Sequence, residues 1–243
     1  MKFKNVLLIS AMTLSPLLVN GGQTYAATVG NTNSYADVTF TINDNSTVTP
    51  VDPGNPETPI TPVDPHQPGT SGPLSIDYVS NLHFGSYVAS GSDQVYYAQL
   101  DEFKKTTDGT EIKVPNFVQV TDNRGTNAGW NLTVSQNGQF SANEGANVLT
   151  GAQLKLSNPM VNSTNSMIYA PVASNVTLDP SGAAQDVVNA SAGKGMGTWT
   201  TSYGSDLTQG AKSVSLSVPG STAKVQDSQY TTSLTWTLTD APL

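Results

Sequence analysis

Apolar and polar residues alternate along short stretches of this chain, and clusters of Gly, Asn, Asp and Pro separate the stretches. Alternation with a period of two puts every second side chain on one face, as in a β-strand with one buried face. The pattern predicts strands at Leu74–Tyr78, Val95–Gln99, Ile112–Thr121, Trp130–Gln136, Ala152–Ser157, Met167–Leu178, Gly197–Tyr203, Ser213–Val218 and Tyr230–Thr239. Many short strands joined by turns indicate an all-β fold, either an antiparallel β-sandwich or a barrel-like domain.

The segment before these strands is rich in proline. Eight prolines lie between Thr49 and Pro73, and the sequence TPVDP occurs there twice. Proline fixes the backbone in an extended form and removes a hydrogen-bond donor, so residues 43–73 are predicted to be an exposed loop or linker. Residues 35–42, YADVTFTI, alternate like a strand and are predicted to pair back into the main sheet, because a lone strand is unstable. The stretch SGAAQDVVNASA, residues 181–192, is read as a short helix or an insertion.

The first residues resemble an export signal. Lys2 and Lys4 precede an apolar run, and small residues follow it near Ala26 and Ala27. The run, at about 15 residues, is shorter than the roughly 20 that a membrane span needs. We therefore predict a cleaved signal peptide over residues 1–27, with a signal anchor as the weaker alternative, and a single domain over residues 28–243.

Charge and cysteine content restrict the partners and the compartment. The chain has 10 Lys and Arg against 18 Asp and Glu, and without Lys2 and Lys4 the net charge becomes −10. This acidity argues against nucleic acid and anionic lipid as partners. The chain has no cysteine, although exported domains often carry disulfides. A secreted protein without disulfides fits a Gram-positive surface, where the hydrophobic core alone provides stability.

Two predicted strands contain Trp-x-Leu. In the first, Trp130 and Leu132 share a face, and in the second Trp236 and Leu238 do. Side chains on one face of a strand most often belong to the core, so alternation alone favours a structural role. The alternative is that an indole ring reaches the surface and stacks on a sugar, and the pattern leaves this open for both tryptophans.

These motifs carry a resemblance to a known family. The segments GWNLTVS and LTWTLTDAP, with the flanks between them, the signal and the PVDP stretch, resemble the WxL surface proteins of low-GC Gram-positive bacteria over essentially the whole mature chain. The resemblance implies non-covalent attachment to peptidoglycan, and this agrees with the absence of a Leu-Pro-x-Thr-Gly sorting motif. It also implies assembly with membrane-anchored companions and larger WxL proteins, and contact with host extracellular proteins.

The chain resembles a small member without a separate effector domain. The alternative function is therefore a structural or host-adhesion subunit that a partner protein holds at the wall.

No enzyme motif supports catalysis. The chain has two histidines, no cysteine nucleophile, no His-x-x-x-His pair and no Gly-x-Ser-x-Gly turn, and no cofactor or metal is expected. A glycan hydrolase with two distant carboxylates is the remote alternative.

Several other residues are candidates for ligand or partner contact. Asp122 and Arg124 lie in one turn, where they form either a local ion pair or a site in which the arginine binds a carboxylate. Tyr96 and Tyr97 are adjacent, so one of them faces outward from a strand. Trp199 follows a glycine-rich stretch that suits a loop or a bulge.

Overall fold

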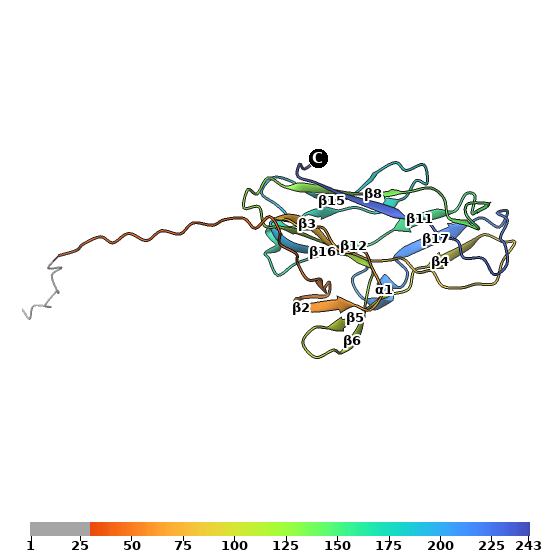
Figure 1. Cartoon of the computed structure of the whole chain (residues 1–243), viewed down its shortest axis with the longest axis horizontal. Coiled ribbons are helices and arrows are strands. Elements are labelled where there is room, and N and C mark those ends of the chain that lie inside the picture. Colours follow the sequence, from red (N-terminus) through yellow and green to blue (C-terminus); the bar gives the residue numbers. More distant parts are fainter. Residues whose placement is uncertain (1–29) are drawn as a thin grey trace, which may run out of the picture. The chain divides into compact units, whose positions relative to one another are not determined.

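The computed structural model describes residues 30–243, so the predicted signal peptide lies outside the described part. The chain divides into two units, Met1–Phe40 and Thr41–Leu243, and the described strands all lie in the second (Figure 1). These strands form antiparallel sheets around one large core and one small core, which confirms the predicted all-β sandwich class. Within residues 30–243, no helix combines the length and the apolar character needed to cross a membrane.

Both Trp-x-Leu motifs lie in one sheet, named here the Trp-x-Leu sheet. Its strand order is β13-β15-β8-β18, where the strands are β13 (Val172–Ala173), β15 (Gln185–Ala190), β8 (Trp130–Gln136) and β18 (Leu234–Thr239). The first motif is therefore on an inner strand and the second is on an edge strand. In the register of β8 and β18, Trp236 pairs with Val134 and Leu238 pairs with Leu132.

Two further sheets complete the sandwich. The central sheet has the order β12-β16-β7-β3, with β12 (Pro159–Asn162), β16 (Gly197–Tyr203), β7 (Phe117–Asp122) and β3 (Leu74–Val79). The side sheet has the order β14-β11-β17-β4, with β14 (Val176–Thr177), β11 (Gln153–Leu156), β17 (Val214–Val218) and β4 (Gln94–Tyr97). The large core lies between the Trp-x-Leu sheet and these two sheets, and all three contribute to it.

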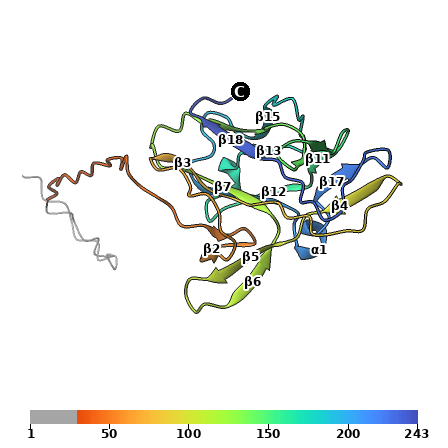
Figure 2. The same cartoon turned by 45° about the vertical axis from the view of Figure 1, so that its right-hand side comes forward.

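A small sheet builds a second core on the other face of the central sheet. Its order is β1-β2-β5-β6, with β1 (Val51–Asp52), β2 (Asn55–Pro62), β5 (Asp101–Lys105) and β6 (Glu111–Val114) (Figure 2). Ile60, Phe103 and Val114 from the small sheet pack against Tyr78 and Phe117 of the central sheet. Because β7 is covered on both faces, all six of its residues are buried.

A bulge in β3 lets this strand serve both cores. The register between β3 and β7 shifts between Ile76 and Tyr78, so that one extra residue stands between them. Without the bulge, residues two apart would share a face. With it, Ile76 enters the large core and Tyr78 enters the small one.

The proline-rich segment is more ordered than predicted. Residues 43–73 were expected to form an exposed loop, but β1 and β2 lie inside this stretch and Ile60 is fully buried. Proline has no N–H to donate, but its carbonyl can still accept. Pro59 of β2 accepts a hydrogen bond from Thr106 N at 3.0 Å. The prediction that this segment packs against nothing was wrong at Ile60, because proline excludes donors and does not exclude acceptors.

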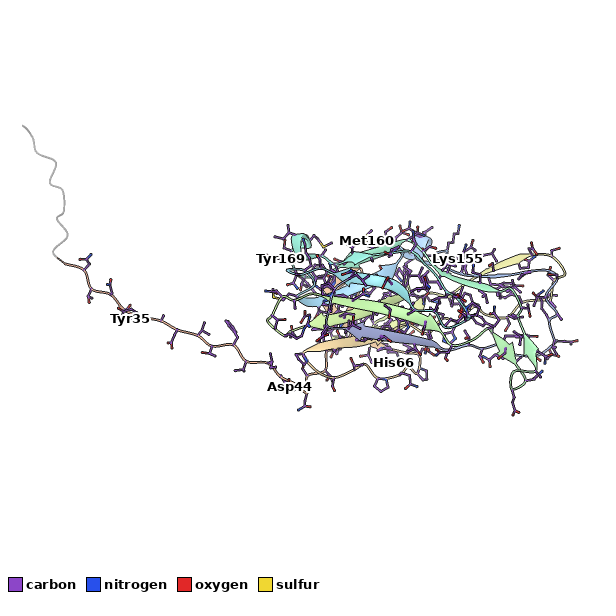
Figure 3. All side chains as sticks on the ribbon, turned by 90° about the horizontal axis from the view of Figure 1, so that it is seen from above. Tyr35, Asp44, His66, Lys155, Met160 and Tyr169 are labelled. Atoms are coloured by element: carbon purple, nitrogen blue, oxygen red, sulfur yellow. The ribbon has the colours of Figure 1, made fainter. Side chains whose placement is uncertain are left out.

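The predicted strand at residues 35–42 is absent. Residues 30–43 have no regular secondary structure (Figure 3). Tyr35, Val38 and Phe40 are 97%, 75% and 90% exposed. The alternation that predicted a strand is present in the sequence, but the structure gives this segment no partner strand.

Other predictions were correct in part. Strands β8 and β16 have the predicted bounds, whereas the strand expected over Ile112–Thr121 is split into β6 and β7 by Pro115 and Asn116. The strand expected over Met167–Leu178 is replaced by the 3-10 turn η1 (Met167–Tyr169), β13 and β14, because Pro171 interrupts it. The expected helix or insertion at residues 181–192 is β15, an inner strand. The remaining elements are β9 (Ser141–Ala142), β10 (Asn147–Val148) and the helical turn α1 (Leu207–Gly210).

Candidate functional site

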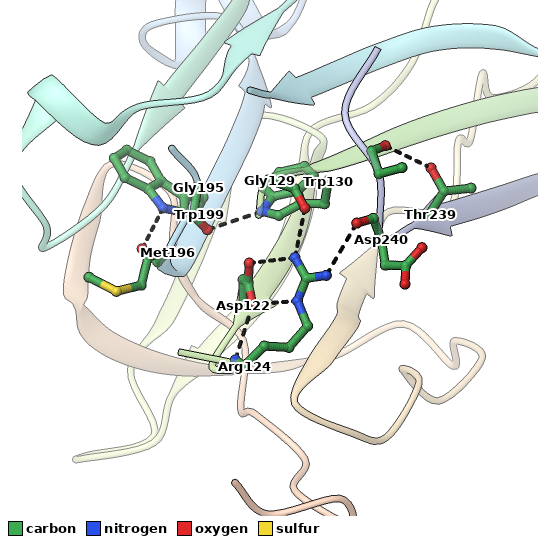
Figure 4. A network of polar contacts seen from close by, with 10 residues as sticks. Asp122, Arg124, Gly129, Trp130, Gly195, Met196, Trp199, Thr239 and Asp240 are labelled. Carbon is green, nitrogen blue, oxygen red and sulfur yellow. Dashed lines mark hydrogen bonds and ion pairs between the residues drawn. The ribbon is translucent and has the colours of Figure 1, made fainter. Parts of the chain in front are cut away.

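The tryptophan of the first motif is a core residue. Trp130 begins β8 with 1% of its surface exposed, and Leu132 on the same face is fully buried. The indole N–H needs an acceptor at this depth, and it donates to the carbonyl of Gly195 at 3.0 Å (Figure 4). With its ring covered and its only donor used, Trp130 has no surface left for a ligand.

Trp199 was a candidate for partner contact, and the structure places it in the same core. It lies on β16 with 1% of its surface exposed, and its indole N–H donates to the carbonyl of Met196 at 2.9 Å. The loop before β16 therefore supplies acceptors to both buried indoles, from the adjacent residues Gly195 and Met196. No surface of the Trp199 ring is left for a partner, because alternation on β16 points it inward.

Gly195 is what allows this loop to approach Trp130. Its φ is +76°, and an added Cβ would lie 2.4 Å from Trp130 Nε1 and 2.5 Å from the Cβ of Ala190. The glycine-rich stretch was predicted to form a loop or bulge, and its packing role against Trp130 was not predicted. The signal was a run of three alternate glycines, Gly193, Gly195 and Gly197, directly before a buried tryptophan.

Arg124 holds the ends of the two Trp-x-Leu strands together. Its guanidinium forms a two-point ion pair with Asp122, with Nε 2.9 Å from Oδ1 and one terminal nitrogen 2.8 Å from Oδ2. It also donates to the carbonyl of Gly129, just before β8, at 2.7 Å and to that of Asp240, just after β18, at 3.3 Å (Figure 4).

This guanidinium is occupied by the protein itself. The side chain of Arg124 is 15% exposed and that of Asp122 is 3% exposed. The ion pair with Asp122 raises the pKa of Arg124. Of the two roles considered for these residues, the geometry supports the local ion pair, because all three guanidinium nitrogens of Arg124 donate to acceptors of the protein itself.

Trp236 differs from the other two tryptophans. It packs against the large core but is only half-buried, and Leu234 and Leu238 on the same strand face are half-buried too. The difference follows from position, because an edge strand has a neighbour on one side only. Trp236 is thus the Trp-x-Leu ring with surface available to solvent.

The outer face of the Trp-x-Leu sheet carries hydroxyl groups. Thr235, Thr237 and Thr239 on β18 are exposed, and in register they lie opposite the partly buried Ser135 and Thr133 and the buried Asn131 on β8. Asp186 of β15 is exposed beside Thr133 and accepts a hydrogen bond from Asn131 Nδ2 at 2.9 Å. We call this set the hydroxyl face. It presents a flat array of donors and acceptors with one carboxylate.

Of the adjacent tyrosines Tyr96 and Tyr97, one faces outward from a strand, as predicted. Tyr97 on β4 is 41% exposed, whereas Tyr96 packs against the large core and lies beside Tyr87, with their ring centroids 4.4 Å apart. Only Tyr97 points away from the core, and it stands at the edge of the side sheet, away from both Trp-x-Leu strands in the sheet order.

Two buried acids were not singled out from the sequence. Burial raises the pKa of Asp77, even though its carboxylate accepts hydrogen bonds from Ser75, Gln119 and Thr121. Burial likewise raises the pKa of Asp101, whose carboxylate accepts from Tyr78 Oη at 2.6 Å.

Both carboxylates accept hydrogen bonds from residues in and around the small core, so their role is structural. Within residues 30–243, no group of three or more His, Cys, Asp or Glu side chains could hold a metal ion.

Comparison with known proteins assigns the chain to a family. A family model described as WxL domain, surface cell wall-binding, matches residues 27–242. No curated protein and no solved structure matches the chain significantly. The match covers nearly the whole chain and includes both Trp-x-Leu strands, so the chain belongs to the WxL domain family of cell wall-binding surface proteins.

Proposed function

We propose that this protein is exported and attaches non-covalently to peptidoglycan, and that the hydroxyl face of the Trp-x-Leu sheet makes the contact. The observation that carries the proposal is the burial of two of the three tryptophans, together with the pairing of the arginine within the protein. Trp130 and Trp199 are enclosed and Arg124 is occupied, so these residues position the sheet, and the motif region exposes its outer face and part of Trp236.

The chemistry of this face suits an uncharged glycan. Sugars offer hydroxyl and amide groups that pair with the Ser and Thr side chains of this face, each of which can donate or accept. Thr237 and Thr133 face each other across β18 and β8, and the register repeats this arrangement along the strands. A ladder of such groups fits an extended polymer better than a small ligand, which would need a deep pocket.

Sedimentation with insoluble peptidoglycan, stripped of protein and teichoic acid, tests the proposal. The double variant Thr235→Val/Thr237→Val removes two exposed hydroxyls at constant shape. At about 0.5–1.5 kcal/mol for each hydrogen bond, its affinity should fall roughly fivefold to a hundredfold. Thr177→Val, an exposed threonine on β14 of the side sheet, is the matched control and should bind as the wild type does. Equal binding of all three proteins would place the contact elsewhere.

A second candidate function has an observation of its own. The three methionines after residue 29, Met160, Met167 and Met196, are 47%, 55% and 42% exposed, and Ile168 is 64% exposed. Met160 and Met167 line a groove of about 350 Å³, and Figure 3 shows Met160 and Tyr169 along the same side of the domain. Exposed methionines adapt to varied apolar partners, so this surface favours a companion protein that holds the chain at the wall indirectly.

Native walls that retain their proteins separate the two functions. Direct attachment predicts sedimentation with protein-free peptidoglycan and no effect of Met167→Glu. Indirect attachment through a companion predicts sedimentation with native walls alone, and loss of that sedimentation in Met167→Glu. Release of soluble sugar during the incubation would instead indicate a hydrolase.

A further inference from the structure

A hollow of about 370 Å³ adjoins the hydroxyl face on the side of β13 and β15, and we call it the β15 hollow. In the strand register, Val172 of β13 pairs with Asn189 of β15, Asn189 pairs with Asn131 of β8, and Asn131 pairs with Thr239 of β18. These four residues form one row across the outer face of the Trp-x-Leu sheet. The lining of the hollow includes Val172, Ser174, Asp186, Asn189, Ser191 and Leu243. Ligand pockets span about 300–1,000 Å³, so the hollow has room for one side group of a polymer.

Two amide oxygens in this row have no hydrogen-bond partner. Asn131 is 4% exposed although it lies on the outer face, and its Oδ1 is buried without a donor from the described chain. Oδ1 of Asn189, its register partner, is buried and unpartnered as well. The terminal torsion of an asparagine is soft, so a small rotation of Asn189 turns its oxygen toward a donor in the hollow. A buried acceptor without a donor is costly, and a ligand with N–H groups here would remove that cost.

The carboxylate of Asp186 brings an unpaired negative charge to the same hollow. Its Oδ1 accepts from Asn131 Nδ2 at 2.9 Å, which orients the side chain, and its Oδ2 accepts no hydrogen bond from residues 30–243. No ion pair joins Asp186 to any residue of that range, and no Lys, Arg or His lines the hollow. The β15 hollow therefore lacks a cation for its carboxylate.

Other carboxylates of the domain are already engaged. Asp122 is paired with Arg124, and Asp64 accepts from Asn81 and His83. Asp77 and Asp101 are buried and accept hydrogen bonds from the protein itself. Asp186 differs from these four acids because it is exposed and stands beside unpartnered acceptors in a hollow.

The groups of the hollow match a primary ammonium ion. An ammonium has three N–H donors and no acceptor, and it carries the positive charge that Asp186 lacks. A phosphate or carboxylate would be repelled by Asp186. A neutral hydroxyl could donate to Asn189 but would leave the charge of Asp186 unpaired. The apolar side chains of Val172 and Leu243 in the same lining suit the methylene stem of an aliphatic amine.

We propose that the β15 hollow binds a primary ammonium group of peptidoglycan while the hydroxyl face contacts the glycan beside it. This inference rests on the proposed function, because it names a group that the same sheet face recognises. Such an ammonium has two sources in a wall. One is the diamino-acid side chain of an uncross-linked peptide stem, and the other is a sugar that has lost its acetyl group. The apolar lining of the hollow favours the aliphatic source.

Sedimentation with chemically modified peptidoglycan tests the role of the ammonium. Acetic anhydride in bicarbonate converts the free amines of protein-free peptidoglycan into neutral amides. The affinity of the wild type should fall roughly tenfold to hundredfold on the acetylated material, because a charge-assisted hydrogen bond is lost. Asp186→Asn should show the same fall on untreated peptidoglycan and no further fall after acetylation. Its side-chain oxygen still accepts from Asn131, so the fold of the sheet is kept.

Asp227→Asn is the matched control. It removes the same charge from an exposed position in the loop before β18, outside the lining of the hollow, and it should bind as the wild type does. Equal binding of the wild type to untreated and acetylated peptidoglycan overturns the proposal. So does an Asp186→Asn variant that binds as tightly as Asp227→Asn.

Soluble amines test the hollow independently of the wall. Nα-acetyl-lysine amide, its neutral Nε-acetylated form and glucosamine are titrated into the isotope-labelled protein and followed by NMR. The lysine compound should shift the backbone amide signals of Asp186 and Asn189, and the Nε-acetylated form should not. Asp186→Asn should lose these shifts. Tighter binding of glucosamine would support the site and assign the ammonium to a sugar.

The two measurements separate this inference from the proposed function. A protein that sediments with peptidoglycan but shows no shift on β15 with either amine overturns the ammonium site alone. A protein that shows the shifts but does not sediment supports the ammonium site and contradicts the proposed wall attachment.

Discussion

Arg124 and Asp122 form a two-point ion pair whose arginine also donates to the backbone at the start of β8 and the end of β18. Removing the arginine leaves the buried carboxylate of Asp122 without its cation. Arg124→Met should therefore lower the free energy of unfolding by about 3–5 kcal/mol, measured by urea denaturation.

The double variant Asp122→Asn/Arg124→Met removes the charge as well as its partner. It should recover part of the loss, because no unpaired carboxylate remains. A single variant that costs less than about 1 kcal/mol would show that the pair behaves as an exposed one.

Gly195 and Gly193 offer a matched pair of substitutions. Both have positive φ, +76° and +81°, but only Gly195 would place a Cβ against Trp130, while Gly193 has open space within 4 Å. Gly193→Ala should cost about 1–2 kcal/mol through backbone strain alone. Gly195→Ala should cost roughly 2–4 kcal/mol, because the loop must also move away from the indole. Equal losses in thermal or urea unfolding would contradict the packing role.

Substitution by phenylalanine should lower the free energy of unfolding by different amounts at the two Trp-x-Leu tryptophans. Trp130→Phe loses ring volume and the hydrogen bond to Gly195, so it should lower the free energy of unfolding by about 2–4 kcal/mol. Trp236→Phe should cost about 1 kcal/mol or less, because the indole is only partly covered and its N–H has no partner in the described chain. Fluorescence gives an independent check, since only loss of Trp236 should remove the solvent-exposed, red-shifted part of the emission.

The buried carboxyl group of Asp77 makes the free energy of unfolding decrease as the pH rises. Burial raises its pKa in the folded state, so the folded protein binds a proton more readily than the unfolded chain does. The contribution to stability is complete below the unfolded pKa of 3.8 and is lost as the pH rises through the folded pKa. Asp101 acts in the same direction.

Asp77→Asn removes this titration. Its free energy of unfolding should therefore decline less than that of the wild type as the pH is raised from 4 to 7, in urea titrations at fixed ionic strength. A steeper decline in Asp77→Asn would mean that the carboxylate is stabilised as the anion by its three donors.

The strands that could be predicted are those with only one face on a core, because such strands alternate apolar and polar residues along the sequence. β8 places Trp130, Leu132 and Val134 in the large core and the polar Asn131, Thr133 and Ser135 on the opposite face, so its sequence carries a clean period of two. β5 could not be found, because its short DEFKK sequence has one buried apolar residue, Phe103, which packs into a second core that the local pattern does not reveal. β2 was hidden by its prolines, which suggest an exposed spacer until Ile60 is seen to be covered.

The sequence predicted which residues of the candidate site share a strand face better than it predicted the role of each residue. Parity placed Trp130 with Leu132 and Trp236 with Leu238, and the structure keeps both pairings. Parity could not tell an inner strand from an edge strand, and that difference makes Trp130 buried and Trp236 half-exposed. The acceptors for the two buried indoles come from a loop about 65 residues away from Trp130, a distance over which one sequence carries no pairing information.

The wide separation of β8 and β18 has a consequence for how the protein is made. The hydrogen bond between Thr133 and Thr237 joins residues 104 positions apart. At translation rates of about 5–20 residues per second, β18 follows β8 by roughly 5–20 seconds. During this interval one side of β8 has no neighbour, and the Trp-x-Leu sheet stays incomplete until the second motif arrives. The cover that Leu234, Trp236 and Leu238 give the large core is likewise completed only when the second motif has been synthesised.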